Sequence, residues 1–366
     1  MENGAFQEMR YKILGKSGLR VSELCLGTMT FGEDWGSFLR GASKEESKEI
    51  FDLFVEAGGN FIDTANNYQN GTSEKYVGDL IASEREKFVL ATKYTLTTNP
   101  NDPNASGSHR KNLLQSVNAS LKRLNTAYID MLWVHAWDYM TPIEELMRSL
   151  DDLIRSGKVL YVGMSDAPAW VVAQANTMSE LQGWSPFIGL QIMYSLMERS
   201  PERDLLPMAR NLDIGVTAWS PLGGGVLSGK YSNEIQEQKR FDPNNPMTSG
   251  FVNERNLSIA KEVQIIATEK NNTPSQVALS WLRHRGDRGV IIPIVGARSR
   301  AQMRDNLGSL DVNLSPDQLK RLDEISKIEL GFPHDFLSSD MIKTLLYGNT
   351  YSSIDYHRAG LLNDTY

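Results

Sequence analysis

The feature of this chain that most constrains its fold is a repeated alternation of apolar runs with amphipathic segments. The apolar runs are continuous, which is typical of strands buried on both faces of a parallel sheet. A strand followed by a helix, eight times over, predicts an α/β protein built as a (β/α)8 TIM barrel. The expected strands lie at residues 22–30, 61–63, 87–94, 129–138, 159–166, 187–196, 213–225 and 289–297.

An open, doubly wound sheet is the alternative fold. No G-x-G-x-x-G motif follows the first apolar run, so the sequence does not favour a dinucleotide-binding domain of that kind. We expect a single domain over 1–366, in which residues 11–328 form the barrel and begin with a β-hairpin at residues 11–24. Residues 329–366 lack a clear period and are rich in aromatics, so this irregular C-terminal extension is either packed on the barrel or a substrate-pocket lid.

Composition bears on three properties of the protein: its binding to nucleic acid, its cellular compartment and its association with membranes. The net charge is −7, the pI is near 5.4, and Lys and Arg are scattered, so we expect no nucleic-acid partner. The one cysteine, Cys25, allows no disulfide within the chain and fits a reducing compartment. The sequence carries no apolar run typical of a signal peptide or a membrane span, so we expect a cytoplasmic protein with no membrane partner. Oligomeric state is not readable from the sequence.

Polar residues at the ends of the expected strands point to a site. In a TIM barrel the chemistry lies at the C-terminal ends of the strands. Three neighbouring strands end near Asp63, Lys93 and His135, and Tyr68 follows Asp63 by five residues. Taken singly, Asp63 could cap a turn, Lys93 could extend to water, and His135 could be a core histidine. Their occurrence on adjacent strands favours a common function.

The chemistry that needs these side chains together is proton donation to a carbonyl oxygen that receives a hydride. A free tyrosine titrates near pH ~10, and a neighbouring lysine cation lowers that pKa. A carboxylate keeps the lysine charged and oriented, while a neutral histidine polarises the carbonyl. The five histidines are dispersed and form no His-x-His motif, so we expect no metal site.

Seven motifs together resemble the aldo-keto reductase family: FIDTANNY, VLATKY, MLWVHAWD, VLYVGMSD, LQIMYS, WSPLGGGVLSGKY and IPIVGARSRAQMRDN. The likeness covers residues 11 to about 328 and is greatest to the aryl-alcohol dehydrogenase-like branch. It implies that Tyr68 is the acid, that Lys93 and Asp63 tune it, and that His135 orients the substrate. It also implies NADP(H) bound without a Rossmann domain, with the nicotinamide stacked on Trp219.

The resemblance further implies a set of cofactor contacts. Ser165, Asp166 and Gln191 match carboxamide contacts, although many family members have Asn where this chain has Asp166, which could instead cap the next helix. Arg298 and Ser299 match contacts to the 2′-phosphate, and Gln302 and Asn306 lie by the adenine. The full expected set is Ser165, Asp166, Gln191, Trp219, Ser220, Pro221, Leu222, Gly223, Gly225, Lys230, Gly296, Arg298, Ser299, Gln302 and Asn306.

The glycine-rich sequence GGVLSGKY closely resembles the P-loop motif G-x-x-x-x-G-K-[ST]. Tyr231 stands where a metal-binding hydroxyl is required, which argues against a nucleoside triphosphatase. We expect the amides of Leu222 to Gly225 to approach the cofactor pyrophosphate and residues 231–250 to fold over it as a clasp. A flexible connector is the alternative.

We therefore expect an NADPH-dependent oxidoreductase that reduces aldehydes or ketones, aromatic ones included, to alcohols. One alternative is a cofactor-binding regulatory subunit of the potassium-channel β-subunit type, which shares this fold. Another is a lyase or isomerase that uses Lys93 as a Schiff base. The physiological substrate cannot be read from the sequence, although aromatic residues in the loops at 94–108 and 136–140 suggest a pocket that accepts rings.

Overall fold

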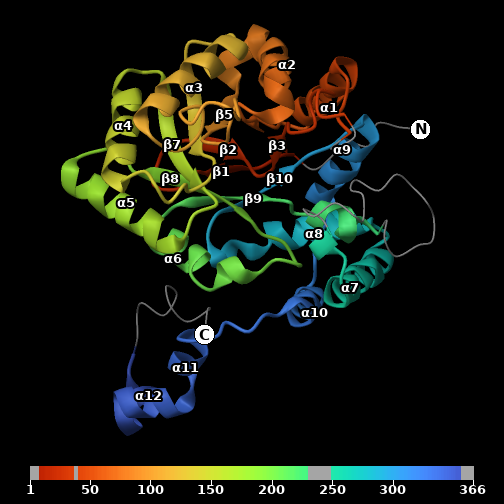
Figure 1. The fold of residues 1–366 in the computed structure, drawn as a ribbon. Helices are drawn as coiled ribbons and strands as arrows, with labels where there is room; N and C mark the ends of the chain where they lie inside the picture. The colour runs from red at the N-terminus through yellow and green to blue at the C-terminus, as the bar shows by residue number, and fades with distance from the viewer. Residues whose placement is uncertain (1–7, 37–39, 230–248, 356–366) are drawn as a thin grey trace.

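The chain folds around a closed parallel barrel, as the sequence predicts (Figure 1). The computed structural model describes residues 8–36, 40–229 and 249–355. Barrel strands are hydrogen-bonded in the order β10-β3-β4-β5-β6-β7-β8-β9, so an open doubly wound sheet is excluded. The strands are β3 (Cys25–Gly27), β4 (Phe61–Asp63), β5 (Val89–Tyr94), β6 (Ile129–Val134), β7 (Val159–Ser165), β8 (Phe187–Met193), β9 (Gly215–Trp219) and β10 (Ile291–Val295).

Helices surround the barrel and bury the outer faces of the strands (Figure 1). The first of them begins as predicted, because Ser43 and Glu46 form a reciprocal capping box at its N-terminus. Two of the helices, α7 and α10, are additions to the strand–helix repeat and pack against each other. The helices are α1 (Lys44–Glu56), α2 (Thr72–Ile81), α3 (Arg110–Arg123), α4 (Ile143–Arg155), α5 (Ala169–Gln182), α6 (Leu205–Asn211), α7 (Glu254–Lys270), α8 (Pro274–Arg283), α9 (Arg300–Leu307) and α10 (Pro316–Ser326).

The predicted N-terminal hairpin closes one end of the barrel. Its strands, β1 (Tyr11–Ile13) and β2 (Arg20–Ser22), pair antiparallel. Leu14 and Val21 are fully buried and belong to the apolar cluster of the barrel interior. The hairpin turn is held at the starts of the strands, where the Lys16 amide donates to the Asp213 carbonyl at 2.6 Å. The barrel is therefore plugged at its N-terminal end, which leaves the C-terminal ends of the strands for a site.

One large ring fills much of the barrel interior. Trp133 on β6 is fully buried, and two glycines on the next two strands make room for it. A Cβ atom added at Gly189 would lie 2.6 Å from the Trp133 ring and from Met131 Cε, and Gly163 is equally crowded by both side chains. Close packing of this kind is sensitive to a single added methyl group.

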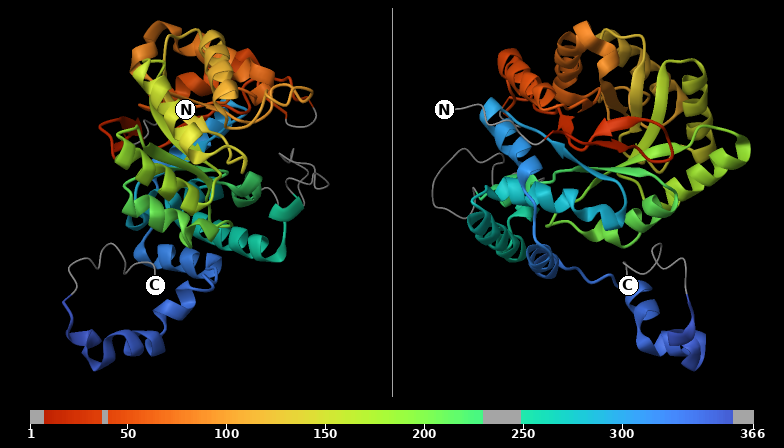
Figure 2. Two further views of the ribbon diagram at one scale, coloured as in Figure 1. Left: turned by 60° about the vertical axis from the view of Figure 1, so that its left-hand side comes forward. Right: turned by 180° about the vertical axis from the view of Figure 1, so that it is seen from behind.

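The C-terminal extension lies outside the barrel. It contains α11 (His334–Ser338) and α12 (Asp340–Tyr347), which stand beyond α6 and α10 in Figure 1 and in both views of Figure 2. The three views agree that these helices do not overlie the barrel. Across the described residues, the helices are too short or too polar for any of them to cross a membrane.

The packing around Trp133 predicts the effect of a minimal substitution. Gly189→Ala should lower the free energy of unfolding by about 1–3 kcal/mol, because overpacking forces side chains off their preferred rotamers. Urea unfolding followed by circular dichroism measures this loss. Gly18→Ala is the matched control, since no atom lies within 4 Å of the Cβ position there. Equal loss in both variants would contradict the packing argument.

Candidate active site

Three adjacent strands and one turn bring the predicted polar residues together. Asp63 ends β4, Lys93 lies near the end of β5, and His135 follows β6. The turn after β4 runs beside β5, where the Asn66 amide donates to the Lys93 carbonyl at 3.1 Å. This turn returns Tyr68, the first residue of a short 3-10 helix, to a position over Lys93. The sequence prediction that these four residues meet is consistent with this geometry.

A buried ion pair forms the centre of the site. The Lys93 ammonium lies 2.5 Å from Asp63 Oδ2, and both side chains are almost fully buried. Lys93 Nζ also donates to the Thr64 carbonyl at 2.9 Å and to the Tyr68 hydroxyl at 3.1 Å. Its three N–H groups are therefore all engaged, which is what a buried ammonium requires to offset its desolvation.

Gln191 contributes to this cluster from the far side of the barrel. Its Nε2 donates to Asp63 Oδ1 at 3.0 Å, so the two carboxylate oxygens of Asp63 have separate partners. The sequence assigned Gln191 to the cofactor only. The contact with Asp63 was missed because the two residues are far apart in the chain; the only available signal was a buried polar residue near a strand end.

The surroundings of Tyr68 favour its protonated form. Burial raises the pKa of Tyr68, and this outweighs the nearby charge of Lys93, which lowers it. The expectation that Lys93 brings the phenol pKa below its ordinary value is therefore wrong for the protein without cofactor. Burial opposes the charged form of Lys93, but the Asp63 carboxylate more than compensates and the pKa of Lys93 lies above its usual value.

His135 is held in its neutral form. Burial, followed by the charge of Lys93, places the pKa of His135 well below its ordinary value. Among the described residues, no group accepts from or donates to its buried Nδ1 atom. The imidazole and the Tyr68 phenol meet edge to face with ring centroids 5.8 Å apart.

Aromatic side chains occur in the loops that follow β3 and β6. Trp35, in the loop after β3, lies edge to face with Tyr68 at 6.2 Å between centroids. Trp137 and Tyr139, after β6, form a second pair at 6.3 Å. The sequence indicated Trp137 and Tyr139, but Trp35 was missed because its loop carries no periodic pattern.

Asp166 and Trp219 form a second part of the site. Asp166 Oδ1 accepts a hydrogen bond from Trp219 Nε1 at 3.0 Å, which fixes the plane of the indole. The alternative that Asp166 caps α5 is wrong, because Pro168 is the N-cap residue and no side chain caps that helix. Ser165 and Gln191 lie next to each other as partners in the register of β7 and β8.

The glycine run after β9 folds as a tight turn. Gly223, Gly224 and Gly225 all have positive φ, which glycine adopts without strain. Their amides already donate within the turn: Gly223 to the Ser220 carbonyl, Gly224 to Ser220 Oγ and Gly225 to the Leu222 carbonyl. Three of the four amides that we expect to approach a pyrophosphate therefore already have partners within the turn.

A cavity of about 410 Å³ adjoins this turn. The N-termini of α8 and α9 both reach it, through Thr273, Pro274 and Ser275 of α8 and through Arg298 before α9. Helix N-termini and an arginine together favour an anionic ligand. The predicted cofactor residues that line the cavity are Leu222, Gly225, Gly296, Arg298, Gln302 and Asn306.

Other predicted cofactor residues lie elsewhere. Ser299 caps α9 by accepting from the Gln302 amide at 3.3 Å, and it does not line the cavity. Pro221 and Gly223 are buried and do not line the cavity. Lys230 and the predicted clasp up to residue 248 lie outside the described residues.

Arg40 is a second cation near Arg298 that the sequence did not indicate. Burial, and then the positive charge of Arg40, hold the pKa of Arg298 below its ordinary value. The backbone connects the two: Thr30 Oγ1 donates to the Ala297 carbonyl at 2.7 Å, and the Ala42 amide donates to the Thr30 carbonyl at 2.7 Å. Two neighbouring cations beside a cavity fit a phosphate group.

In the part of the chain described here, no cluster of His, Cys, Asp or Glu has the arrangement of a metal site.

Comparison with known proteins agrees with the barrel fold. Residues 23–327 match the model of the aldo/keto reductase family. The chain belongs to the aldo/keto reductase family. It is 37% identical to the norsolorinic acid reductase of Aspergillus flavus over 335 residues, which cover 89% of this chain and 84% of that protein. It is 36% identical over 340 residues to the putative aryl-alcohol dehydrogenase AAD14 of Saccharomyces cerevisiae, covering 90% of each chain.

A third relative adds to this group. The aryl-alcohol dehydrogenase GME11368 of Pestalotiopsis microspora is 37% identical over 335 residues, covering 90% of this chain and 85% of that protein. Reductases and aryl-alcohol dehydrogenases thus recur among the relatives of this aldo/keto reductase, and the chain is an oxidoreductase with aryl-alcohol dehydrogenase-like relatives.

The Lys93–Asp63 ion pair predicts how the stabilities of the wild type, a single variant and a double variant should be ordered. Asp63→Asn should lower the free energy of unfolding by about 3 kcal/mol, because it leaves a buried ammonium without a counter-charge. Adding Lys93→Met should recover part of this loss, since the double variant buries no unpaired charge. Thermal and urea unfolding of the two variants measure the series. A double variant less stable than Asp63→Asn would contradict the pairing.

Proposed function

We propose that this aldo/keto reductase is an NADPH-dependent enzyme that reduces aldehydes or ketones, aryl carbonyls among them, to alcohols. The observation that carries the proposal is the Lys93 ammonium, which contacts the Asp63 carboxylate and the Tyr68 hydroxyl at once. The names of the relatives, norsolorinic acid reductase and aryl-alcohol dehydrogenase, support a carbonyl–alcohol interconversion.

Tyr68 is the proton donor in this proposal. NADPH, when bound, supplies the hydride that adds to the carbonyl carbon. Tyr68 gives its hydroxyl proton to the carbonyl oxygen, so that one hydride and one proton complete the alcohol. Because burial keeps the phenol protonated at neutral pH, the donor is ready before substrate binds. The phenolate that remains is stabilised by the Lys93 cation 3.1 Å away.

The residues around Tyr68 orient the reacting groups. Lys93 donates to the phenolic oxygen, so the hydroxyl hydrogen of Tyr68 is left to point toward the substrate. A neutral His135 donates a hydrogen bond to the carbonyl oxygen and adds no positive charge beside Lys93. The Trp35 ring, which lies edge to face with Tyr68, offers an apolar wall for an aryl group, which supports aromatic substrates.

The cavity beside Arg298 is assigned to the adenosine end of NADPH. Arg298 and Arg40 supply positive charge for a 2′-phosphate, while Gln302 and Asn306 line the same cavity as Arg298. Trp219, fixed by Asp166, offers a flat face for the nicotinamide, and Ser165 lies next to Gln191 for its carboxamide. The residues present therefore fit the cofactor that the family generally uses.

The alternatives from the sequence have less support. The relatives named above are reductases and dehydrogenases, which does not favour a regulatory channel subunit. A Schiff base on Lys93 requires a neutral amine with a free lone pair. Lys93 has a raised pKa and donates three hydrogen bonds, so the ammonium form is strongly favoured.

Loss of the phenolic proton should stop the reaction without stopping cofactor binding. Tyr68→Phe should lower kcat for NADPH-dependent reduction of 4-nitrobenzaldehyde by about a hundred-fold or more. NADPH should still quench tryptophan fluorescence with an unchanged Kd, because the substitution removes no cofactor contact. Absorbance of NADPH and fluorescence titration give the two readouts. Equal kcat in the two proteins would refute Tyr68 as the acid.

The two arginines predict the cofactor preference. Arg298→Ala should weaken NADPH binding by about ten-fold to a hundred-fold, the scale of a charged hydrogen bond, and Arg40→Ala should weaken it less. NADH binding should change little in either variant because NADH lacks the 2′-phosphate. Arg300→Ala is the matched control, since that side chain faces Glu56. Parallel losses for NADPH and NADH would contradict the assignment of the phosphate.

A further inference from the structure

The C-terminal extension has a fixed root and an apolar, solvent-exposed end. We call residues 329–355 the arm. The family match ends at residue 327, so the arm is not part of the shared barrel. It projects away from α6 and α10 in every view of Figures 1 and 2.

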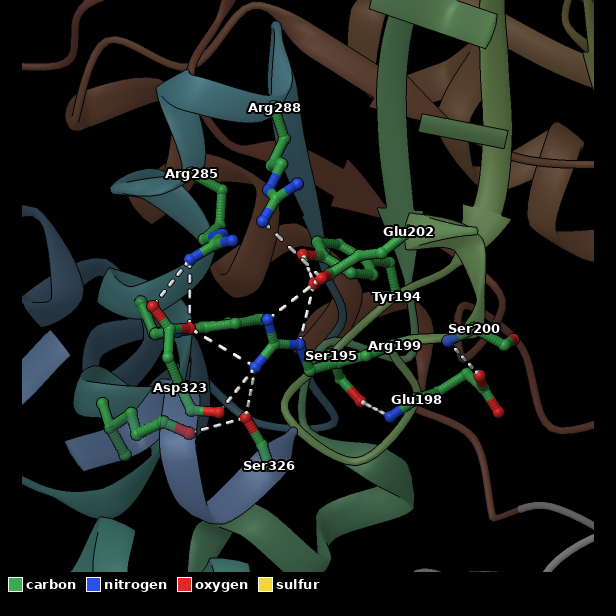
Figure 3. Close-up of polar contacts among 12 residues, drawn as sticks. Tyr194, Ser195, Glu198, Arg199, Ser200, Glu202, Arg285, Arg288, Asp323 and Ser326 are labelled. Carbon is green, nitrogen blue, oxygen red and sulfur yellow. Dashed lines mark hydrogen bonds and ion pairs between the residues drawn. The ribbon is translucent and has the colours of Figure 1, made fainter. Parts of the chain in front are cut away.

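A buried polar network holds the helix from which the arm leaves. Arg199, in the segment after β8, pairs with Glu202 at 2.7 Å and donates to the Asp323 carbonyl at 3.0 Å and to Ser326 Oγ at 2.8 Å (Figure 3). Arg285 Nη1 donates to both oxygens of the Asp323 carboxylate at 3.0 Å (Figure 3). The end of α10 is thus fixed to the barrel.

The first residues of the arm are fixed as well. Arg203 donates to the Glu329 carbonyl at 2.9 Å, and His334 Nε2 lies 3.5 Å from Asp204 Oδ1. His334 is buried. The direction in which the arm projects is therefore set by contacts on both sides of residue 329.

The rest of the arm exposes far more apolar surface than a solvated segment needs. Within residues 329–355, the large apolar side chains that are at least 45% exposed are Phe332, Phe336, Leu337, Met341, Leu345, Leu346, Tyr347, Tyr351 and Ile354. At roughly 100 Å² for each half-exposed side chain, they present on the order of 900 Å². Contiguous apolar patches of more than a few hundred Å² mark interaction sites.

The apolar residues of α12 form one stripe. At 100° per residue, Met341, Ile342, Leu345 and Leu346 fall on one side of the helix, and Asp340, Lys343 and Thr344 fall on the other. Only Ile342, 8% exposed, is covered by the chain itself, whereas Leu345 is 74% exposed. A helix of this length is marginal alone in water, so its apolar stripe needs a partner surface.

Charge and area select the occupant. The arm carries Glu329, Asp335, Asp340 and Asp355 against one basic residue, Lys343, which disfavours an anionic lipid surface. An uncharged apolar stripe is complementary to itself, as a two-fold interface requires. The exposed apolar side chains of the whole arm, of which the α12 stripe is one part, together come to about the 800 Å² that a stable interface covers on each partner.

We propose that two copies of this chain associate through their arms, with the α12 stripes packed against each other around a two-fold axis. The interface contains no residue of the proposed active site, because all of those residues lie before residue 329. The association is therefore independent of the proposed reaction.

Sedimentation velocity of the full chain at micromolar concentration tests the proposal. The mass fitted for the wild-type protein should be twice that of the monomer. The double variant Leu345→Asp with Leu346→Asp should give the monomer mass, and its circular dichroism spectrum should be unchanged. Leu181→Asp is the matched control, because Leu181 is 80% exposed on α5, and it should remain a dimer. A monomeric wild type, or a dimer that survives the arm substitutions, would overturn the proposal.

Cross-linking gives a second readout that does not depend on charge substitutions. The native Cys25 is buried, so an introduced surface cysteine reports its own neighbours. Leu345→Cys should form a disulfide-linked dimer under mild oxidation, and Leu181→Cys should not.

Binding to vesicles of phosphatidylcholine and phosphatidylserine tests a membrane as the alternative partner. If the wild-type protein is monomeric and binds these vesicles, and the arm variant does not bind them, the arm contacts a membrane and the proposal is refuted.

Discussion

The pairing of Lys93 with Asp63 is the interaction on which the site depends. Either charge alone would be expensive in this setting, because both side chains are almost fully buried at the ends of adjacent strands. Once paired, Lys93 still has a donor left for Tyr68, and Asp63 still has an oxygen left for Gln191. The pair thus connects a turn, two neighbouring strands and a strand across the barrel into one rigid cluster.

Burial has opposite effects on the members of this cluster. It disfavours the phenolate of Tyr68 and the imidazolium of His135, so both side chains are neutral at rest. Burial disfavours the charge of Lys93, but Asp63 and Tyr68 more than offset this and raise its pKa. A neutral acid beside a fixed cation is suited to a reaction in which the acid becomes an anion, since the stabilising charge is in place before the proton leaves.

Much of the fold and the centre of the site could be predicted, for a physical reason. Continuous apolar runs specify a buried parallel sheet, and the C-terminal ends of its strands meet at one place, so Asp63, Lys93 and His135 could be grouped from their positions alone. Contacts that cross the barrel or come from irregular loops leave no such local signal. Gln191 reaches Asp63 across 128 residues of sequence, and Trp35 and Arg40 lie in a loop without periodicity. The direction of the Tyr68 pKa was misjudged because sequence shows the lysine but not the extent of burial.

The most direct test of the account is a titration of Tyr68 in the full-length protein without cofactor. Tyrosine labelled with ¹³C at Cζ reports ionisation by NMR, and the signal absent from Tyr68→Phe is the one to follow. Because burial outweighs the Lys93 charge, this phenol should stay protonated through neutral pH and ionise only above the ordinary tyrosine value of about 10. Ionisation well below that value would contradict it, because the Lys93 cation would then outweigh burial and Tyr68 would not be held as an acid.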